Sequence, residues 1–176
     1  MIMRRGQQLL LPANPVFIWL SLLFALLLNA LLSTAVWGRA AWGPDLLSLV
    51  LVFWVMHQPM RIGVGVGFVF GLVMDVQQGA LLGQHALAYT ALAFLAVTMH
   101  RRLLLFDVFT QAVQLLPLLV VSKLLQLLVR MVSGSSFPGW ALFLGPLLEG
   151  VLWPLMTVLL LAPQRRAPDP DDNRPI

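Results

Sequence analysis

The chain has 176 residues, of which 60% are hydrophobic and only 10% are charged. Soluble domains usually carry about 25% charged residues, so this composition excludes an ordinary soluble globule and predicts a chain surrounded by lipid. The net charge is +4 and there is no cysteine, which excludes disulfides and thiolate metal sites. Basic residues stand in short clusters between apolar stretches, so nucleic-acid binding is not expected.

Six apolar stretches follow one another along the chain. A membrane-spanning helix needs about 20 mainly apolar residues, so we predict an all-α, polytopic membrane bundle that forms one domain over residues 1–162. The expected spans are 16–36, 41–57, 62–76, 80–99, 107–132 and 140–162. Residues 163–176 contain four prolines and three aspartates, which predicts a disordered cytoplasmic tail.

Two features of these stretches leave alternatives open. The first stretch follows Arg4 and Arg5 as in a signal peptide, but it is too long for one and five spans follow, so we expect a retained helix. The second and third stretches are short and are joined by few residues. They could therefore form a tight hairpin or include a re-entrant segment.

The arginines predict the orientation of the bundle. An even number of spans places both termini on one side. That side would collect Arg4, Arg5, Arg61, Arg101, Arg102, Arg165, Arg166 and Arg174. The opposite side would have Arg39, together with Arg130 near a helix end, where it would reach toward headgroups. The positive-inside rule then predicts a bacterial inner-membrane protein with both termini in the cytoplasm.

Small residues recur at every fourth position in the third stretch and beyond. The series is Gly63, Gly67, Gly71, Asp75, Gly79 and Gly83. Such a stripe lets a neighbouring helix approach closely, so it predicts a packing face or a partner-binding face. Asp75 would be an ordinary helix-end residue, the anchor of the turn between the third and fourth spans, or a partner contact.

Ionisable residues inside a bilayer are costly and usually face the interior of the bundle. Lys123 and Glu149 lie on consecutive expected spans, both roughly 13–14 Å from the periplasmic end at 1.5 Å per residue. We hypothesise that they form an ion pair, with Asp75 as the competing partner of Lys123. In the alternative, Lys123 reaches outward and Glu149 is protonated.

The fifth span has further polar residues. Asp107, Gln111, Gln114 and Ser122 fall within about 80° of a helical wheel at 100° per residue, and Gln126 is a further intramembrane polar candidate. This face should point into the bundle or toward a partner helix rather than toward lipid.

Catalytic patterns are not found. His57, His85 and His100 lack metal-ligand spacing, and Ser133, Ser135 and Ser136 fall in a loop. The glycines follow a helical period, which a phosphate-binding loop does not. We therefore expect a protein that is not an enzyme and that has no cofactor and no metal.

A resemblance to a known family rests on the third span. The run Gly67-Phe68-Val69-Phe70-Gly71-Leu72-Val73-Met74-Asp75, followed by Gly79, Leu82-Gly83 and Ala86-Leu87, resembles the pattern Gly-Phe-x-x-Gly-Leu-x-x-Asp, then Gly, then Leu-Gly. This pattern is that of the MreD family of rod shape-determining proteins. Arg61 also suits the family, and the resemblance covers about residues 15–162.

The resemblance implies a fold and a function. The fold would be similar to the substrate-binding membrane subunits of ECF transporters. The function would be that of a non-enzymatic component of the bacterial cell-elongation (Rod) complex. It would bind MreC and, through it, be linked to RodA, a class B penicillin-binding transpeptidase and MreB filaments. Membrane lipid would surround it.

Two other classes of function are a ligand-binding subunit and a channel. A small-molecule or lipid-intermediate binding subunit, as in ECF transporters, would need a polar pocket of a few hundred Å³ that opens outward near Asp75, Lys123 and Glu149. A collapsed ion pair would favour the scaffold instead. A channel would need a continuous polar path, and the first two spans offer almost none.

Overall fold

The computed structural model describes residues 14–37 and 42–164. Over these residues the regular structure is entirely helical, which confirms the predicted all-α class. The six α-helices are α1 (Pro15–Leu32), α2 (Leu46–His57), α3 (Val64–Gln78), α4 (Gln84–Leu103), α5 (Val108–Val132) and α6 (Leu144–Leu161). Short helical turns extend α1 over Ser33–Trp37, precede α6 over Trp140–Phe143 and follow it over Ala162–Gln164.

The expected tail at 163–176 lies outside the described residues, except for Pro163 and Gln164. These two residues belong to the last 3₁₀ turn after α6, so the helical part of the chain ends slightly later than expected.

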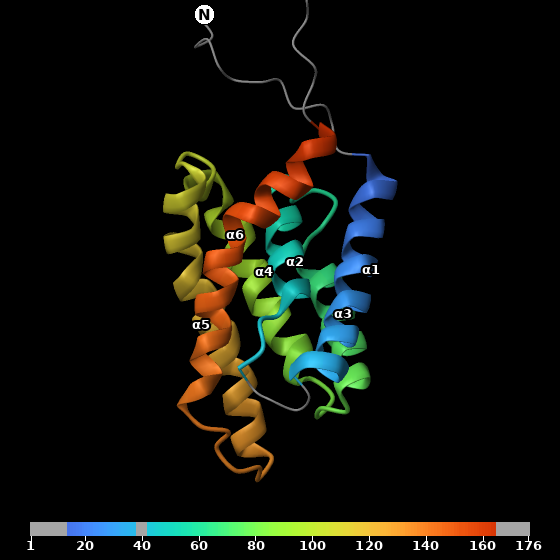
Figure 1. Cartoon of the computed structure of the whole chain (residues 1–176), viewed down its shortest axis with the longest axis vertical. Coiled ribbons are helices and arrows are strands. Elements are labelled where there is room, and N and C mark those ends of the chain that lie inside the picture. Colours follow the sequence, from blue (N-terminus) through green and yellow to red (C-terminus); the bar gives the residue numbers. More distant parts are fainter. Residues whose placement is uncertain (1–13, 38–41, 165–176) are drawn as a thin grey trace, which may run out of the picture.

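Three helical stretches are long and apolar enough to cross a membrane: Pro15–Val36, Val108–Val132 and Trp140–Gln164. Together with the shorter apolar helices α2 and α3, they indicate a multi-pass membrane protein. The start of α1 and the end of α6 lie at the same end of the bundle, here named the terminal end (Figure 1). The α3–α4 turn and the α5–α6 connection lie at the opposite, distal end.

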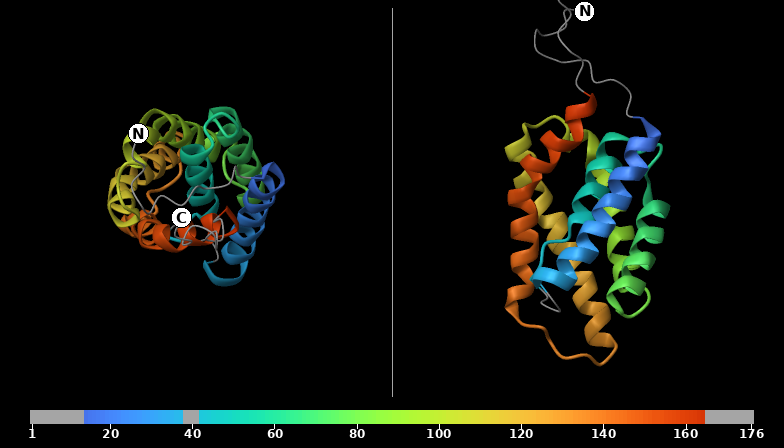
Figure 2. Two further views of the ribbon diagram at one scale, coloured as in Figure 1. Left: turned by 90° about the horizontal axis from the view of Figure 1, so that it is seen from above. Right: turned by 45° about the vertical axis from the view of Figure 1, so that its right-hand side comes forward.

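Helix α2 lies at the centre of the bundle. Every residue from Leu47 to Met56 is buried, because this helix is apolar on all sides except at Ser48 and can pack on every side. It packs against α1, α4 and α6, inside the ring that the other helices form (Figure 2). The alternative of a tight hairpin between the second and third spans is therefore wrong, since α3 pairs with α4 instead.

Glycines bring α3 and α4 into close contact. A Cβ added at Gly71 would lie 2.4 Å from Ala86 Cα, and one added at Gly67 would lie 2.8 Å from the carbonyl oxygen of Tyr89. Between these helices, Gly79 and Gly83 adopt φ angles of +60° and +102°, which other residues rarely tolerate. The stripe is therefore an internal packing face at its start and a turn at its end.

This packing predicts opposite effects for two identical substitutions in α3. Gly71→Ala should lower stability by about 1–3 kcal/mol, because the new methyl group would force the α3 and α4 backbones apart. Gly65→Ala should leave stability unchanged or raise it slightly, because nothing lies within 4 Å of its added Cβ and alanine favours the helix. Thermal unfolding in detergent measures both, and equal midpoints for the two variants would contradict the close α3–α4 packing.

Candidate functional site

Asp75 joins the end of α3 to the start of α4. Its carboxylate is fully buried and accepts hydrogen bonds from the backbone N–H groups of Gly83 at 2.8 Å, His85 at 2.7 Å and Ala86 at 3.4 Å. The Nδ1 atom of His85 lies 2.8 Å from Asp75 Oδ1. A carboxylate at a helix N-terminus satisfies backbone donors that have no partner within the helix. Asp75 is therefore the anchor of this turn, as one of the three interpretations of the sequence held.

A second buried carboxylate, that of Asp45, joins three helices. It accepts hydrogen bonds from Asn29 Nδ2 of α1 at 3.1 Å, from the Tyr89 hydroxyl of α4 at 2.5 Å and from the backbone N–H of Ser48 at 3.2 Å. The last of these contacts makes Asp45 the N-cap of α2. One side chain thus fixes α1, α2 and α4 relative to one another.

Glu149 of α6 contacts the same region. Its Oε1 accepts from the backbone N–H of Asp45 at 2.9 Å, and its Oε2 accepts from Ser48 Oγ at 3.3 Å. The donors that satisfy this buried carboxyl group therefore come from the start of α2 rather than from Lys123.

The expected ion pair between Lys123 and Glu149 is wrong. The ion pair that the described residues contain joins His85 to Asp75, and no nitrogen of Lys123 lies within 4.0 Å of a carboxylate oxygen there. Lys123 lies instead against Gly145, whose added Cβ would be 3.6 Å from Lys123 Cε. Asp75 is not the partner of Lys123 either.

The polar residues of α5 point mainly into the bundle. Gln111, Ser122 and Gln126 are buried, and Trp153 Nε1 of α6 donates a hydrogen bond of 3.4 Å to Gln111 Oε1. Gln114 is half-buried. Asp107 is exposed and caps the start of α5 through Thr110.

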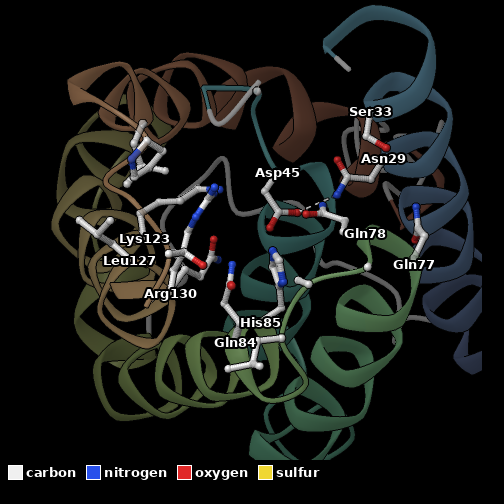
Figure 3. Close-up of a pocket in the computed structure, with 18 of the residues that line it drawn as sticks. Asn29, Ser33, Asp45, Gln77, Gln78, Gln84, His85, Lys123, Leu127 and Arg130 are labelled. Carbon is white, nitrogen blue, oxygen red and sulfur yellow. Dashed lines mark hydrogen bonds between the residues drawn. The ribbon is translucent and has the colours of Figure 1, made fainter. Parts of the chain in front are cut away.

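A polar cavity of about 690 Å³ opens at the distal end of the bundle. Figure 3 shows polar side chains from α1, α3, α4 and α5 and from the start of α2 around it. Its lining includes Asn29, Asp45, Gln84, His85, Lys123 and Arg130. Ligand sites commonly have volumes of about 300–1,000 Å³ and a few convergent polar groups. The cavity is thus large enough and polar enough to hold a ligand.

Two lining side chains of α5 make no direct hydrogen bond or ion pair. Lys123 is 8% exposed and Gln126 is 6% exposed, yet neither makes a hydrogen bond or ion pair with any residue that the structure describes. Buried polar groups normally have hydrogen-bond partners. Of the positions expected from the sequence, Lys123 and Gln126 line the cavity, whereas Asp75 and Glu149 do not.

Sequence reasoning missed the central residues Asp45, Asn29 and Tyr89. The signal for two of them was present, because Asn29 and Asp45 each interrupt an apolar stretch. Asp45 follows Pro44 near the start of the second stretch, where a polar residue suggests a helix boundary rather than a buried contact. Metal binding gains no support from these groups, since no set of three or more potential ligands gathers within residues 14–37 and 42–164.

Two aspartates that cap helices give a matched test of burial. Asp75→Ala should lower stability by about 2–4 kcal/mol, because several buried N–H donors lose their acceptor. Asp107→Ala removes an exposed cap and should cost about 0.5–1 kcal/mol. Thermal or denaturant unfolding in detergent compares them, and an equal loss in both variants would show that the Asp75 contacts add nothing beyond an ordinary cap.

Comparison with known proteins agrees with the resemblance seen in the third span. The family model of rod shape-determining protein MreD matches residues 13–162. A rod shape-determining protein MreD of Haemophilus influenzae is 28% identical over 123 residues, which are 70% of this chain and 76% of that protein. No solved structure matches the chain, so the likeness to ECF transporter subunits stays a prediction. The chain belongs to the MreD family of rod shape-determining proteins.

Proposed function

We propose that this chain is a non-enzymatic inner-membrane component of the cell-elongation complex that binds MreC and thereby takes part in regulating peptidoglycan synthesis. The family itself implies a role in rod shape determination. The observation that carries the proposal is that the family match covers residues 13–162, which include every helix described. RodA, the transpeptidase and MreB would be reached through MreC.

The shape of the bundle supports binding through helix faces. The described residues form helices joined by short connections, so a partner has little other surface to contact. Helix α1 is the extreme case, because only Ile18, Leu22, Ala25 and Asn29 of its 18 residues are buried. The rest of its apolar surface faces lipid or a partner helix.

The orientation is part of this proposal. Arg101 and Arg102 lie in the last turn of α4, and this helix ends at the terminal end (Figure 1). Basic residues gather on the cytoplasmic side of membrane proteins. We place the terminal end in the cytoplasm, so the distal cavity opens toward the periplasm, where MreC has most of its mass.

A specific observation favours a second candidate, a ligand-binding subunit of the ECF type. The polar cavity has a volume of about 690 Å³, which is large enough for a ligand of a few hundred Å³. The ion pair between Lys123 and Glu149, which would have favoured a scaffold, is not formed. The family match favours the first candidate, since it links the chain to rod shape.

The test is co-purification from detergent-solubilised membranes, followed by mapping of the contact. We expect the tagged chain to recover MreC. A photo-cross-linking residue at exposed apolar positions should then identify the face involved. Suitable positions are Leu20 of α1, Val76 of α3, Phe94 of α4, Phe109 of α5 and Leu155 of α6.

Buried Leu51 of α2 serves as the control position and should give no cross-link to MreC. Gly71→Leu is unsuitable as a contact variant, because Gly71 faces α4 and its replacement would damage the fold itself. Recovery of an ATPase pair and a tightly bound small molecule, without MreC, would replace this proposal with the transporter subunit.

A further inference from the structure

An apolar groove lies beside the polar cavity, between α1 and α3. The groove has a volume of about 480 Å³ and is lined by Leu26, Leu27 and Ala30 of α1 and by Leu72, Val73 and Val76 of α3, together with Gln77. Gln77 also lines the cavity. The next polar residues of the same two helices, Asn29 and Gln78, line the cavity as well. The two spaces therefore meet between the distal halves of α1 and α3.

The cavity carries an excess of positive charge toward a ligand. Lys123 and Arg130 line it, and Asp45 is its acidic lining residue. The carboxylate of Asp45 is already occupied by hydrogen bonds from Asn29, Tyr89 and Ser48. The Lys123 ammonium group, by contrast, makes no hydrogen bond and no ion pair within 4.0 Å with any described residue, and its electrostatic neighbour is the buried carboxyl group of Glu149, which does not line the cavity.

Lys123 and Arg130 come from the same face of α5. Lys123 and Arg130 are seven residues apart on α5, which places them two turns and about 10 Å apart on one face of the helix. Lysine and arginine bind phosphate through charge-assisted hydrogen bonds. Side-chain amides of Gln84 and Gln126 add donors for the remaining polar atoms of a headgroup.

We propose that this junction binds a membrane lipid with a phosphate-bearing headgroup. The phosphate lies in the cavity near Lys123 and Arg130, and the hydrocarbon chains lie in the groove between α1 and α3. A lipid explains both parts at once, because a water-soluble phosphate would leave the groove unused and a plain hydrocarbon would leave Lys123 without a direct ion pair.

Access from the bilayer agrees with this occupant. Leu27 and Val76, one on each side of the groove, are 67% and 71% exposed, so the groove faces the surrounding lipid. A lipid can enter sideways between the two helices without crossing the protein. The proposal does not depend on MreC binding, because it rests on the cavity, the groove and a buried lysine that makes no direct hydrogen bond or ion pair with any described residue.

The first test compares three probes on the purified, full-length chain in neutral detergent. Dioleoyl phosphatidic acid in mixed micelles should raise the unfolding midpoint by several degrees, because a ligand that binds the folded state stabilises it. Dioleoylglycerol has the same chains without the phosphate, and inorganic phosphate has no chains, so both should have little effect. An equal shift with either control, or no shift with phosphatidic acid, would overturn the proposal.

Paired variants separate this site from general charge and surface effects. Lys123→Gln should weaken phosphatidic acid binding about tenfold or more, as expected for a lost charged hydrogen bond. Arg101→Gln, the same charge change at the terminal end, should have no effect. Leu27→Trp should weaken binding by filling the groove, whereas Leu20→Trp on the same helix should not.

Leu27 is exposed, so its variant folds independently of the buried lysine and keeps the test valid if Lys123→Gln is unstable. Unchanged binding in Leu27→Trp would refute the groove as the chain site. A final experiment places a photo-cross-linker at Gln84 and identifies what it labels. Labelled lipid is the expected product, and cross-links to a polypeptide alone would assign the cavity to a protein segment. Loss of MreC in a pull-down would leave these results unaffected, so the two proposals fail separately.

Discussion

Three buried carboxyl groups in an apolar bundle are the constraint on which the arrangement of the helices depends. Asp45, Asp75 and Glu149 are at most 5% exposed, and a buried carboxyl group is costly unless donors satisfy it. Some of the donors are backbone N–H groups at the starts of helices, which lack partners there, and the others are the side chains of Asn29, Tyr89 and Ser48. Asp75 binds the start of α4, while Asp45 and Glu149 bind the start of α2. Each contact therefore satisfies both a buried carboxyl group and a backbone N–H group at a helix start, and the contacts of Asp75 and Glu149 also join two different helices.

The way in which the buried carboxyl groups obtain their hydrogen-bond donors also bears on the polar cavity. The carboxyl groups find their donors at helix starts and in Asn29, Tyr89 and Ser48, and no carboxylate oxygen of the described residues lies within 4.0 Å of the Lys123 ammonium group. The lysine side chain lies beside Gly145 of α6, at ordinary contact distance. A buried cation thus remains at the edge of an open space, which is a feature of binding sites more than of a closed core.

The class of fold could be predicted, because hydropathy is a local pattern. The glycine period singled out Asp75 but left three roles open, since the backbone donors that it binds belong to the next helix. The central place of α2 could not, since its all-round apolar surface suits a lipid-facing helix and a buried helix equally. The Lys123–Glu149 pair failed for a related reason. Equal depth on adjacent helices sets distance along the bundle, but it does not reveal that Asp45 and Ser48 occupy the position next to Glu149 first.

Asn29 and Asp45 hold two helices together and also line the cavity. Their hydrogen bond ties α1 to α2 at the distal end, and both side chains also line the cavity. The hydrogen bond between Asn29 and Asp45 can be formed or broken. An occupant that binds one of these two states more tightly shifts the equilibrium toward that state, by at most the difference in its affinity for the two. Helix α1 has only four buried residues out of 18, so much of its apolar surface is open to a partner helix. A ligand in the cavity therefore acts on the contact that holds α1 to α2 whether or not a partner occupies α1, and its effect on such a partner cannot exceed that same difference in affinity.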